Sequence, residues 1–183
     1  YEMLDDQIGY VKIANFDTRC FDETSAAIDA LLDDGAQALI FDVRDNGGGY
    51  KDELVKILDR LLPEGILFQS EDYSGNKQTD RSAAEFFAAV LQEYDWATVV
   101  GTKTCGKGNF QTAFTLSDGS MLNLSIGKYF TPNGRSLTDI GVTPDEPVEL
   151  SDEDAAKLLY GQLAHADDAQ LQAAIRAIRQ KIS

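Results

Sequence analysis

Residues 101–107, G-T-K-T-C-G-K, match most positions of a phosphate-binding loop. In such a loop a Ser or Thr follows the Lys and ligates magnesium, and a helix follows whose backbone amides hold the phosphates. Here Gly108 follows Lys107, and the residues after it alternate in a way that predicts two strands joined at S-D-G-S. The sequence therefore disfavours nucleotide binding at Lys107.

Lys107 has a second possible chemistry, as a general base. A lysine that is removed from water without a balancing carboxylate loses its proton more easily, and it can then accept the proton of a Ser hydroxyl. The alternative base is the one histidine, His165, which lies in the polar stretch L-A-H-A-D-D beside a predicted C-terminal helix. A Ser-His-Asp triad is therefore disfavoured, and a Ser-Lys pair is favoured.

Ser82 is the candidate nucleophile for such a pair. It begins the predicted helix S-A-A-E-F-F, and a hydroxyl there lies at the positive end of the helix dipole beside backbone amides. The same residues, Ser82 and Glu85, form a capping box, in which the Ser only caps the helix. The motif alone favours capping.

A third feature is the turn Asn46-Gly47-Gly48-Gly49, which lies between a predicted strand and a predicted helix. Glycines let backbone amides approach a ligand closely, which suits an oxyanion hole. A tight strand-to-helix turn explains the same residues equally well. Both interpretations stay open at this point.

Cys20 and Cys105 are the two cysteines, and their spacing does not predict a metal site. They could form a disulfide, be packed as small apolar side chains, or be reactive. For Cys105 we expect packing, because free cysteine is among the most buried residue types. No metal and no cofactor are expected.

The elements that must position these residues alternate between strands and helices. Apolar runs predict strands, and apolar positions at helical spacing predict helices. Asp22 and Ser151 are the expected helix caps. Residues 70–81 are polar and show no apolar period. The pattern favours one α/β layered domain over residues 1–183 with crossover connections. The expected strands are 7–13, 38–43, 66–69, 97–100, 110–116 and 121–129, and the expected helices are 22–33, 52–62, 82–94, 152–163 and 168–181.

Composition narrows the possible partners. The chain is 43% hydrophobic and 26% charged, which is typical of a globular protein, and its formal net charge of −15 would repel nucleic acid and anionic lipid. It contains no run of 18 apolar residues and no signal peptide, so no membrane span is expected in this chain. The start at Tyr1 rather than Met suggests a trimmed chain.

Taken together, these motifs resemble the carboxy-terminal processing proteases, the tail-specific serine peptidases of the S41 type. The resemblance is carried by I-G-Y-V-K-I-A-N-F, L-I-F-D-V-R-D-N-G-G-G, the run from Ser82 through the Gly-Lys-Gly loop, and G-K-Y-F-T-P-N-G-R-S-L-T-D-I-G-V-T-P. It implies Ser82 as nucleophile, Lys107, twenty-five positions later, as base, and Gln111, four beyond, as the residue that orients the Lys. Because a capping box does not predict a Gly-Lys-Gly loop at that spacing, the nucleophile assignment becomes the favoured one.

The resemblance implies a ClpP/crotonase-like spiral core with a β-hairpin after the lysine loop and helices at the C-terminus. It also implies an oxyanion hole from amides near Gly48 and Gly49 and from Ala83, a protein or peptide substrate cut near its C-terminus, and a place in the bacterial cell envelope or outside the cell. Two alternatives are weaker. A non-catalytic peptide-binding module would tolerate loss of the three site residues, but all three are present. An acyl-CoA enzyme would need a basic site for its nucleotide phosphates, and the acidic chain shows none.

The sequence departs from the family pattern in two places. Family members usually carry a PDZ domain, for which no segment here is long enough. They also have a strand and a Gly-Ser-rich turn immediately before the nucleophile, whereas N-K-Q-T-D passes directly into R-S-A-A-E-F-F. Since a strand needs about five or six residues, we expect a segment to be missing just before Ser82, rather than lost in evolution.

Overall fold

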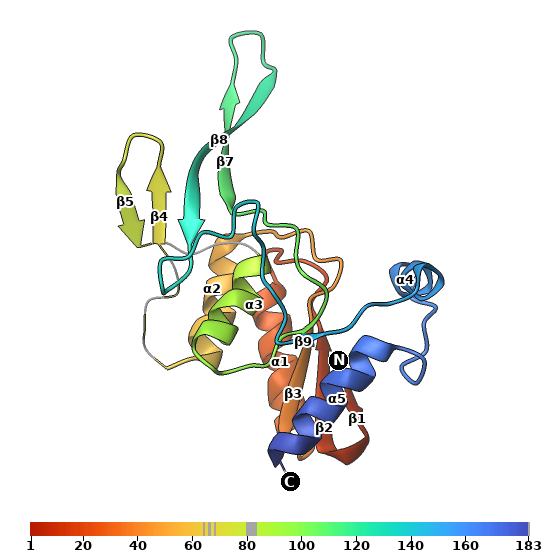
Figure 1. Ribbon diagram of the computed structural model, residues 1–183. Coiled ribbons are helices and arrows are strands. Elements are labelled where there is room, and N and C mark those ends of the chain that lie inside the picture. Colours follow the sequence, from red (N-terminus) through yellow and green to blue (C-terminus); the bar gives the residue numbers. More distant parts are fainter. Residues whose placement is uncertain (64, 66, 68, 80–83, 183) are drawn as a thin grey trace.

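The computed structural model describes residues 1–63, 65, 67, 69–79 and 84–182, and Figure 1 shows their arrangement. A three-stranded sheet runs in the order β1-β2-β3, with β1 (Glu2–Leu4) antiparallel and β3 (Ala38–Asp42) parallel to β2 (Ile8–Lys12). Between β2 and β3 the chain forms α1 (Cys20–Asp33), a crossover of the kind that parallel strands require. A 3-10 turn at Asp5–Gln7 joins β1 to β2.

Helices cover both faces of this sheet. On one face α1, α2 (Lys51–Leu61) and α3 (Ala84–Glu93) form the main core, into which Leu39 and Phe41 of β3 point. On the other face Ile40 packs with a second apolar cluster beneath α5 (Ala169–Ile182). Successive residues of a strand face opposite sides, which explains why neighbours on β3 belong to different clusters. The members of the second cluster are Ile8, Tyr10, Leu171 and Ile175.

A second sheet forms an arm that projects from the body (Figure 1). Its order is β5-β4-β8-β7, all antiparallel, and β7 (Asn109–Thr115) and β8 (Met121–Phe130) are its longest pair. The outer half of this pair carries exposed apolar side chains, among them Met121 at 69% exposure. The other strands are β4 (Gln69–Asp72) and β5 (Lys77–Thr79).

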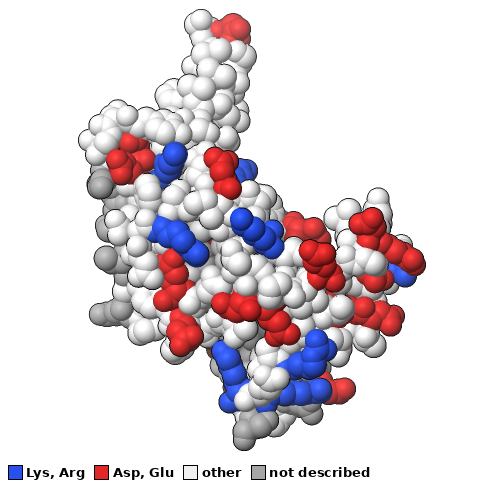
Figure 2. Space-filling view, in the orientation of Figure 1, with Lys and Arg blue, Asp and Glu red and all other residues white. Residues whose placement is uncertain are grey.

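The remaining elements connect the arm to the C-terminus. β6 (Val100–Gly101) pairs in parallel with β9 (Glu146–Pro147), and α4 (Asp152–Leu159) lies to one side of the body with no buried residue. Acidic side chains gather over α4, whereas both signs of charge are mixed over the rest of the face shown in Figure 2. No helix in the described part of the chain is both long and apolar enough to cross a bilayer.

The structure confirms a mixed α/β architecture and the five predicted helices, with ends that differ by a few residues. The spiral arrangement of the core stays a prediction. The helix expected over 152–163 ends at Leu159, because Gly161 adopts a left-handed conformation at φ +65° and the amides of Gly161 and Gln162 bond back to the carbonyls of Leu158 and Lys157.

The strand expected over 66–69 differs in the structure. Residue 67 is not in a strand, β4 begins at Gln69, and residues 66 and 68 lie outside the described residues. The polar stretch after Gln69, which shows no apolar period, forms a hairpin of β4 and β5. Asp72 makes this turn, since its side chain accepts from the amides of Ser74 and Asn76, and Gly75 adopts φ +85°. β4 also pairs with β8, so backbone hydrogen bonds to another strand stabilise this hairpin although its own sequence shows no apolar period.

The cap expected at Asp22 is also wrong. Helix α1 begins at Cys20, and its N-cap residue, Arg19, makes no side-chain capping bond. Instead the buried carboxylate of Glu53, on α2, accepts from the amide of Phe21 at 2.9 Å. A partner from another helix satisfies this first-turn donor, and local sequence does not reveal such a partner.

Candidate active site

Lys107 lies in the loop between β6 and β7, between two buried glycines. Gly106 adopts φ +82°, and a Cβ there would lie 2.9 Å from backbone atoms of the segment 137–140. A Cβ on Gly108 would lie 2.6 Å from the amide nitrogen of Thr138. Glycine is therefore required on both sides of Lys107, because the loop packs directly against another backbone segment.

The same segment and β8 hold the loop by hydrogen bonds. The amide of Asp139 donates to the carbonyl of Gly106 at 2.9 Å, and the amide of Tyr129 donates to that of Gly108 at 2.8 Å. A strand, β7, follows the loop, so the helix that a phosphate loop needs is absent at this point of the described chain. Gly108 replaces the Ser or Thr of a phosphate loop because there is no room for a side chain.

Glu85 ties this loop to α3. Its Oε1 accepts from the amide of Gly106 at 2.8 Å and from the thiol of Cys105 at 3.1 Å, and its Oε2 is buried without a hydrogen-bond partner among the described residues. Glu85 lies one helical turn after Ser82 along the chain. The lysine loop is therefore anchored to the start of the helix that the candidate nucleophile precedes.

Cys105 is exposed, so the prediction that it packs as a buried apolar side chain is wrong. The hydrogen bond to Glu85, together with partial burial and the charge of that carboxylate, raises the pKa of the thiol above its ordinary value. Cys105 is thus held as a thiol at neutral pH, which argues against a nucleophilic role. Cys20 is a free, buried thiol on α1, 3.8 Å from the hydroxyl of Thr24.

The described residues do not join Lys107 to Gln111. Ser82 and Ala83 lie outside the described residues. The ammonium of Lys107 is exposed and has no hydrogen bond or ion pair with the described residues. Gln111 is exposed on β7, and its Nε2 donates to Ser125 Oγ across the arm at 3.4 Å rather than to Lys107. An irregularity in the β7–β8 register between Phe110 and Gln111 fixes that pairing.

The glycine turn after β3 is a rigid, hydrogen-bonded structure. The amide of Gly48 donates to Asn46 Oδ1 at 2.8 Å, and Asn46 Nδ2 donates to the carbonyl of Ile13 at 2.8 Å. Gly49 forms a parallel bridge to Phe16, and a Cβ there would lie 2.3 Å from the Phe16 carbonyl oxygen. The two glycines therefore hold the turn against the segment that follows β2.

This bonding distinguishes the two candidate oxyanion donors. In the bridge, the neighbours of Gly49 make the hydrogen bonds to Phe16, so the N–H of Gly49 points away from it and meets no acceptor in the described chain. The N–H of Gly48 is already used by Asn46. Of the two amides, that of Gly49 is the one free to donate to a ligand.

A largely buried ionic cluster lies at the end of β3, just before the glycine turn in the chain. Arg44 donates to both carboxylate oxygens of Asp42, at 3.0 and 2.7 Å, and reaches Asp168 at the start of α5 at 2.8 Å. The hydroxyl of Tyr10 donates to Asp42 at 2.6 Å. Burial raises the pKa of Asp42, but the hydrogen bonds from Arg44 and Tyr10 outweigh burial, and its pKa lies below the usual range.

Helix α3 contacts both loops. Glu85 holds the lysine loop, and Phe87 packs against Phe16, whose backbone holds Gly49, with ring centroids 6.1 Å apart. Phe87 also packs edge-on against Phe41 of β3 at 5.6 Å. The helix after Ser82 is therefore the element that brings the lysine loop and the glycine turn together.

Comparison with known proteins gives the family. A model of peptidase family S41 matches residues 7–82 and 76–148 of this chain, which is most of its length. The chain belongs to peptidase family S41. This confirms the resemblance drawn from the sequence motifs.

Its relatives in this family are named as processing proteases. A carboxyl-terminal-processing protease of Synechocystis is 31% identical over 188 aligned positions, which cover 92% of this chain and 43% of the relative. The carboxy-terminal processing protease CtpA of Bacillus subtilis is 32% identical over 180 positions, covering 87% of this chain and 38% of the relative. The chain thus spans less than half the length of these relatives.

A solved structure supports the same relationship. The photosystem II D1 C-terminal processing protease superposes with a TM-score of 0.71 at 28% identity, over 90% of this chain and 47% of that one. The S41 fold therefore extends over nearly all of the present chain.

The alignments also show a difference in length. The Synechocystis alignment has 188 positions but takes in 92% of 183 residues, about 168, so the relative has about 20 residues with no counterpart here. The Bacillus alignment gives about 21 by the same reckoning. The family model matches in two pieces that overlap at residues 76–82. A segment missing just before Ser82 stays a prediction.

Two features of the site were missed in the sequence. The capping box is the only role that the sequence suggested for Glu85, although a carboxylate one turn after a candidate nucleophile could itself indicate a residue of the site. The Arg44 cluster was missed because its third member, Asp168, lies 124 positions away. Its one local signal is the charged pair in F-D-V-R-D-N after an apolar strand.

Proposed function

We propose that this protein is a serine endopeptidase that uses a Ser-Lys dyad and cleaves protein substrates near their C-termini. Ser82 is the nucleophile, Lys107 the general base, and Gln111 the residue that orients the base. The observation that carries the proposal is the bond from Glu85 to the amide of Gly106, because it fixes the lysine loop to the helix that Ser82 precedes. Membership of family S41 supports the assignment.

The chemistry follows an acyl-enzyme route. Neutral Lys107 takes the proton of the Ser82 hydroxyl as the oxygen attacks the scissile carbonyl carbon, and the protonated amine then returns that proton to the leaving nitrogen. The same amine then takes a proton from water as the water oxygen attacks the ester carbon, and it returns this proton to the Ser82 oxygen as the acyl group leaves. Each step passes one proton through Lys107, so no metal is needed to balance it.

The surroundings of Lys107 suit this role in one respect. A carboxylate in contact would keep the ammonium charged, and none of the described residues supplies one. The amine is exposed to water in this structure, so the proposal requires that the bound substrate covers it. Gln111 would have to leave Ser125 to reach it, a change that breaks only a long 3.4 Å hydrogen bond.

For the oxyanion we assign the amide of Gly49, helped by that of Ala83, which immediately precedes α3 in the sequence. The amide of Gly48 was an equal candidate in the sequence, but its bond to Asn46 makes it a support for the turn. Donors fixed before the reaction cost no reorganisation when charge develops, which is why a rigid glycine turn suits this purpose.

The test is cleavage of a peptide with an apolar free C-terminus, with the amidated peptide as a specificity control. Ser82→Ala and Lys107→Ala should each abolish cleavage, whereas Lys103→Ala, which removes an exposed lysine from the same loop, should leave it intact. Activity that survives either dyad substitution would sink the dyad. Equal binding of the peptide by all variants without any cleavage would instead support a non-catalytic peptide-binding module.

Location and specificity belong to the same proposal. We infer that the protein acts in the cell envelope or outside the cell, on protein or peptide substrates. Cleavage of free and amidated peptides at equal rates would refute recognition of a free C-terminus, without affecting the dyad.

A further inference from the structure

The strand that follows the lysine loop has a free edge beside the proposed active site. β7 begins two residues after Lys107 and carries Gln111. It is the last strand of the arm, and no strand among the described residues pairs with its outer side (Figure 1). The second match to the family model, residues 76–148, takes in β7 and β8 as one piece. The arm therefore lies within a continuous part of the family match.

The backbone groups of β7 alternate between β8 and this free edge. At one end the carbonyl of Gly108 accepts from the amide of Tyr129, and at the other end the amide of Leu116 donates to the carbonyl of Ser120. Because every second residue of an antiparallel strand bonds to the same neighbour, residues 110, 112 and 114 face β8 as well. An even number of steps separates the two ends, so the alternation is unbroken along β7.

The intervening residues direct their N–H and C=O groups to the free edge. These residues are Gln111, Ala113 and Thr115, and all three are exposed. None of them makes a backbone hydrogen bond to a described residue outside the arm. The irregularity in register does not change this, since its extra residue, Ile126, lies on β8. A row of backbone donors and acceptors thus extends outward from the lysine loop.

The two faces of the arm differ in polarity. Phe114 lies opposite Leu122, and Leu124 lies on the same face, with each side chain 44% or 45% exposed. On the other face Gln111 lies opposite Ser125. A strand added to β7 would extend both faces, so its side chains would alternate between an apolar surface and a polar one.

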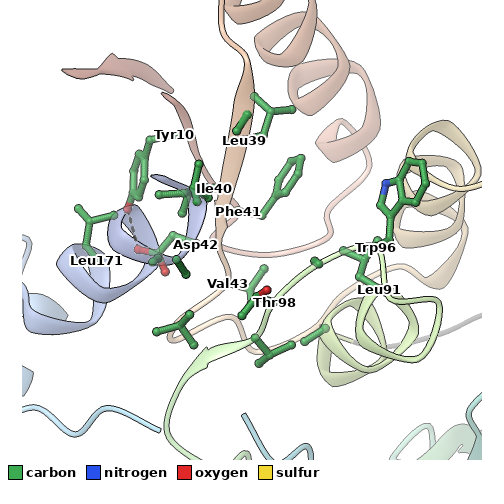
Figure 3. A pocket seen from close by; sticks show the side chains of 18 of the residues that line it. Tyr10, Leu39, Ile40, Phe41, Asp42, Val43, Leu91, Trp96, Thr98 and Leu171 are labelled. Carbon is green, nitrogen blue, oxygen red and sulfur yellow. Dashed lines mark hydrogen bonds between the residues drawn. The ribbon is translucent and has the colours of Figure 1, made fainter. Parts of the chain in front are cut away.

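A second open space in the molecule has a different explanation. A cleft of about 570 Å³ borders β3 and residues 97–100, and Phe41 and Leu91 line it (Figure 3). Because we expect a segment that includes a strand to be missing just before Ser82, that segment is the expected occupant of the cleft. The edge of β7, in contrast, directly continues the loop that carries the proposed base.

We propose that the free edge of β7 binds the substrate as an added antiparallel strand. The inference rests on the proposed function, which places the scissile bond beside Lys107. A cut near the C-terminus leaves only a short segment after that bond, so the segment before it is the one long enough to follow β7 outward. Its chain direction is then opposite to that of β7. The seven residues of β7 span about 24 Å, and backbone bonds of this kind give affinity with little sequence preference.

Binding to Ser82→Ala tests the inference without consuming the substrate. The probe is a peptide of about twelve residues with an apolar free C-terminus, long enough to span β7. Single N-methyl groups, placed in turn along its backbone, should weaken binding about five-fold at every second position, because only alternate amides face β7. Amide exchange should slow at Gln111, Ala113 and Thr115 but not at Phe114, which already faces β8.

A pair of proline variants provides a matched control in the chain itself. Ala113→Pro removes an N–H from the free edge of β7 and keeps the bonds to β8. Asn123 lies directly opposite Ala113 on β8, and its N–H points away from β7, so Asn123→Pro removes an N–H from the opposite side of the arm. With Ser82 intact, Ala113→Pro should raise KM about five-fold at an unchanged kcat, whereas Asn123→Pro should leave both unchanged.

Three results would overturn the proposal. The first is a loss of affinity that does not alternate along the N-methylated peptides. The second is saturable peptide binding that leaves exchange at Gln111, Ala113 and Thr115 unchanged. The third is protection of these amides without peptide that rises with protein concentration, because the occupant of the edge would then be a second copy. These readouts report binding, whereas the loss of cleavage in Ser82→Ala tests the dyad separately.

Discussion

The bond between Glu85 and the lysine loop allows a quantitative test. Glu85→Ala removes an ionised acceptor from the amide of Gly106, a buried residue whose N–H donates at 2.8 Å. A hydrogen bond to a charged group contributes about 2 kcal/mol, so the closed loop should lose roughly 30-fold in its equilibrium with open forms. Glu85→Gln keeps an acceptor oxygen but loses the charge, so about half of this effect is expected.

Amide hydrogen exchange at Gly106 measures this loss directly. Protection should fall roughly 30-fold in the Ala variant and about five-fold in the Gln variant, because exchange follows local opening. Peptide cleavage should fall in the same order, through kcat more than KM, since the base rather than the binding surface is displaced. Glu93→Ala is the matched control, because Glu93 lies at the other end of α3 and binds Arg135 instead.

Cys105 provides an independent readout. Its pKa is raised chiefly by the bond to Glu85, so replacing that carboxylate with an amide should lower the pKa and speed alkylation of Cys105 by iodoacetamide near pH 8, with buried Cys20 as the internal reference. Unchanged exchange at Gly106 together with unchanged alkylation in both Glu85 variants would refute the conclusion that Glu85 holds the loop.

Two further predictions concern the supports of the site. Arg44→Met should lower the free energy of unfolding by about 3–5 kcal/mol in urea titration, because it leaves the buried carboxylates of Asp42 and Asp168 without their partner. Because the folded-state pKa of Asp42 is depressed, its contribution to the free energy of unfolding is present above the unfolded pKa of about 3.9 and is lost as pH falls through the folded value. The thermal-unfolding midpoint should therefore decrease below about pH 4, and a midpoint that stays constant there would contradict this assignment. Gly106→Ala should lower the free energy of unfolding by more than the roughly 1–2 kcal/mol that a left-handed non-glycine residue costs, because the new Cβ also meets backbone atoms. Gly134→Ala, at φ +76° with open space around it, should cost only that amount. Equal losses in the two variants would show that the clash at Gly106 is relieved.

Local patterns in the sequence predicted most of the elements. The apolar positions on α1, α2, α3 and α5 follow helical spacing, and β2 and β3 are continuous apolar runs, so the helices and the parallel pair were predictable. The hairpin of β4 and β5 was not, because its stability comes from the Asp72 turn and from pairing with β8, whose partner residues lie 55 to 61 positions later. Strand pairing of this kind is a tertiary effect, which local periodicity does not encode.

The candidate site was predictable in its loops but not in their connections. The spacing of Ser82, Lys107 and Gln111 and the glycine turn were visible in the sequence, since each depends on residue type. The bond from Glu85 to Gly106 was not visible, because it depends on how α3 packs against a loop 21 positions away.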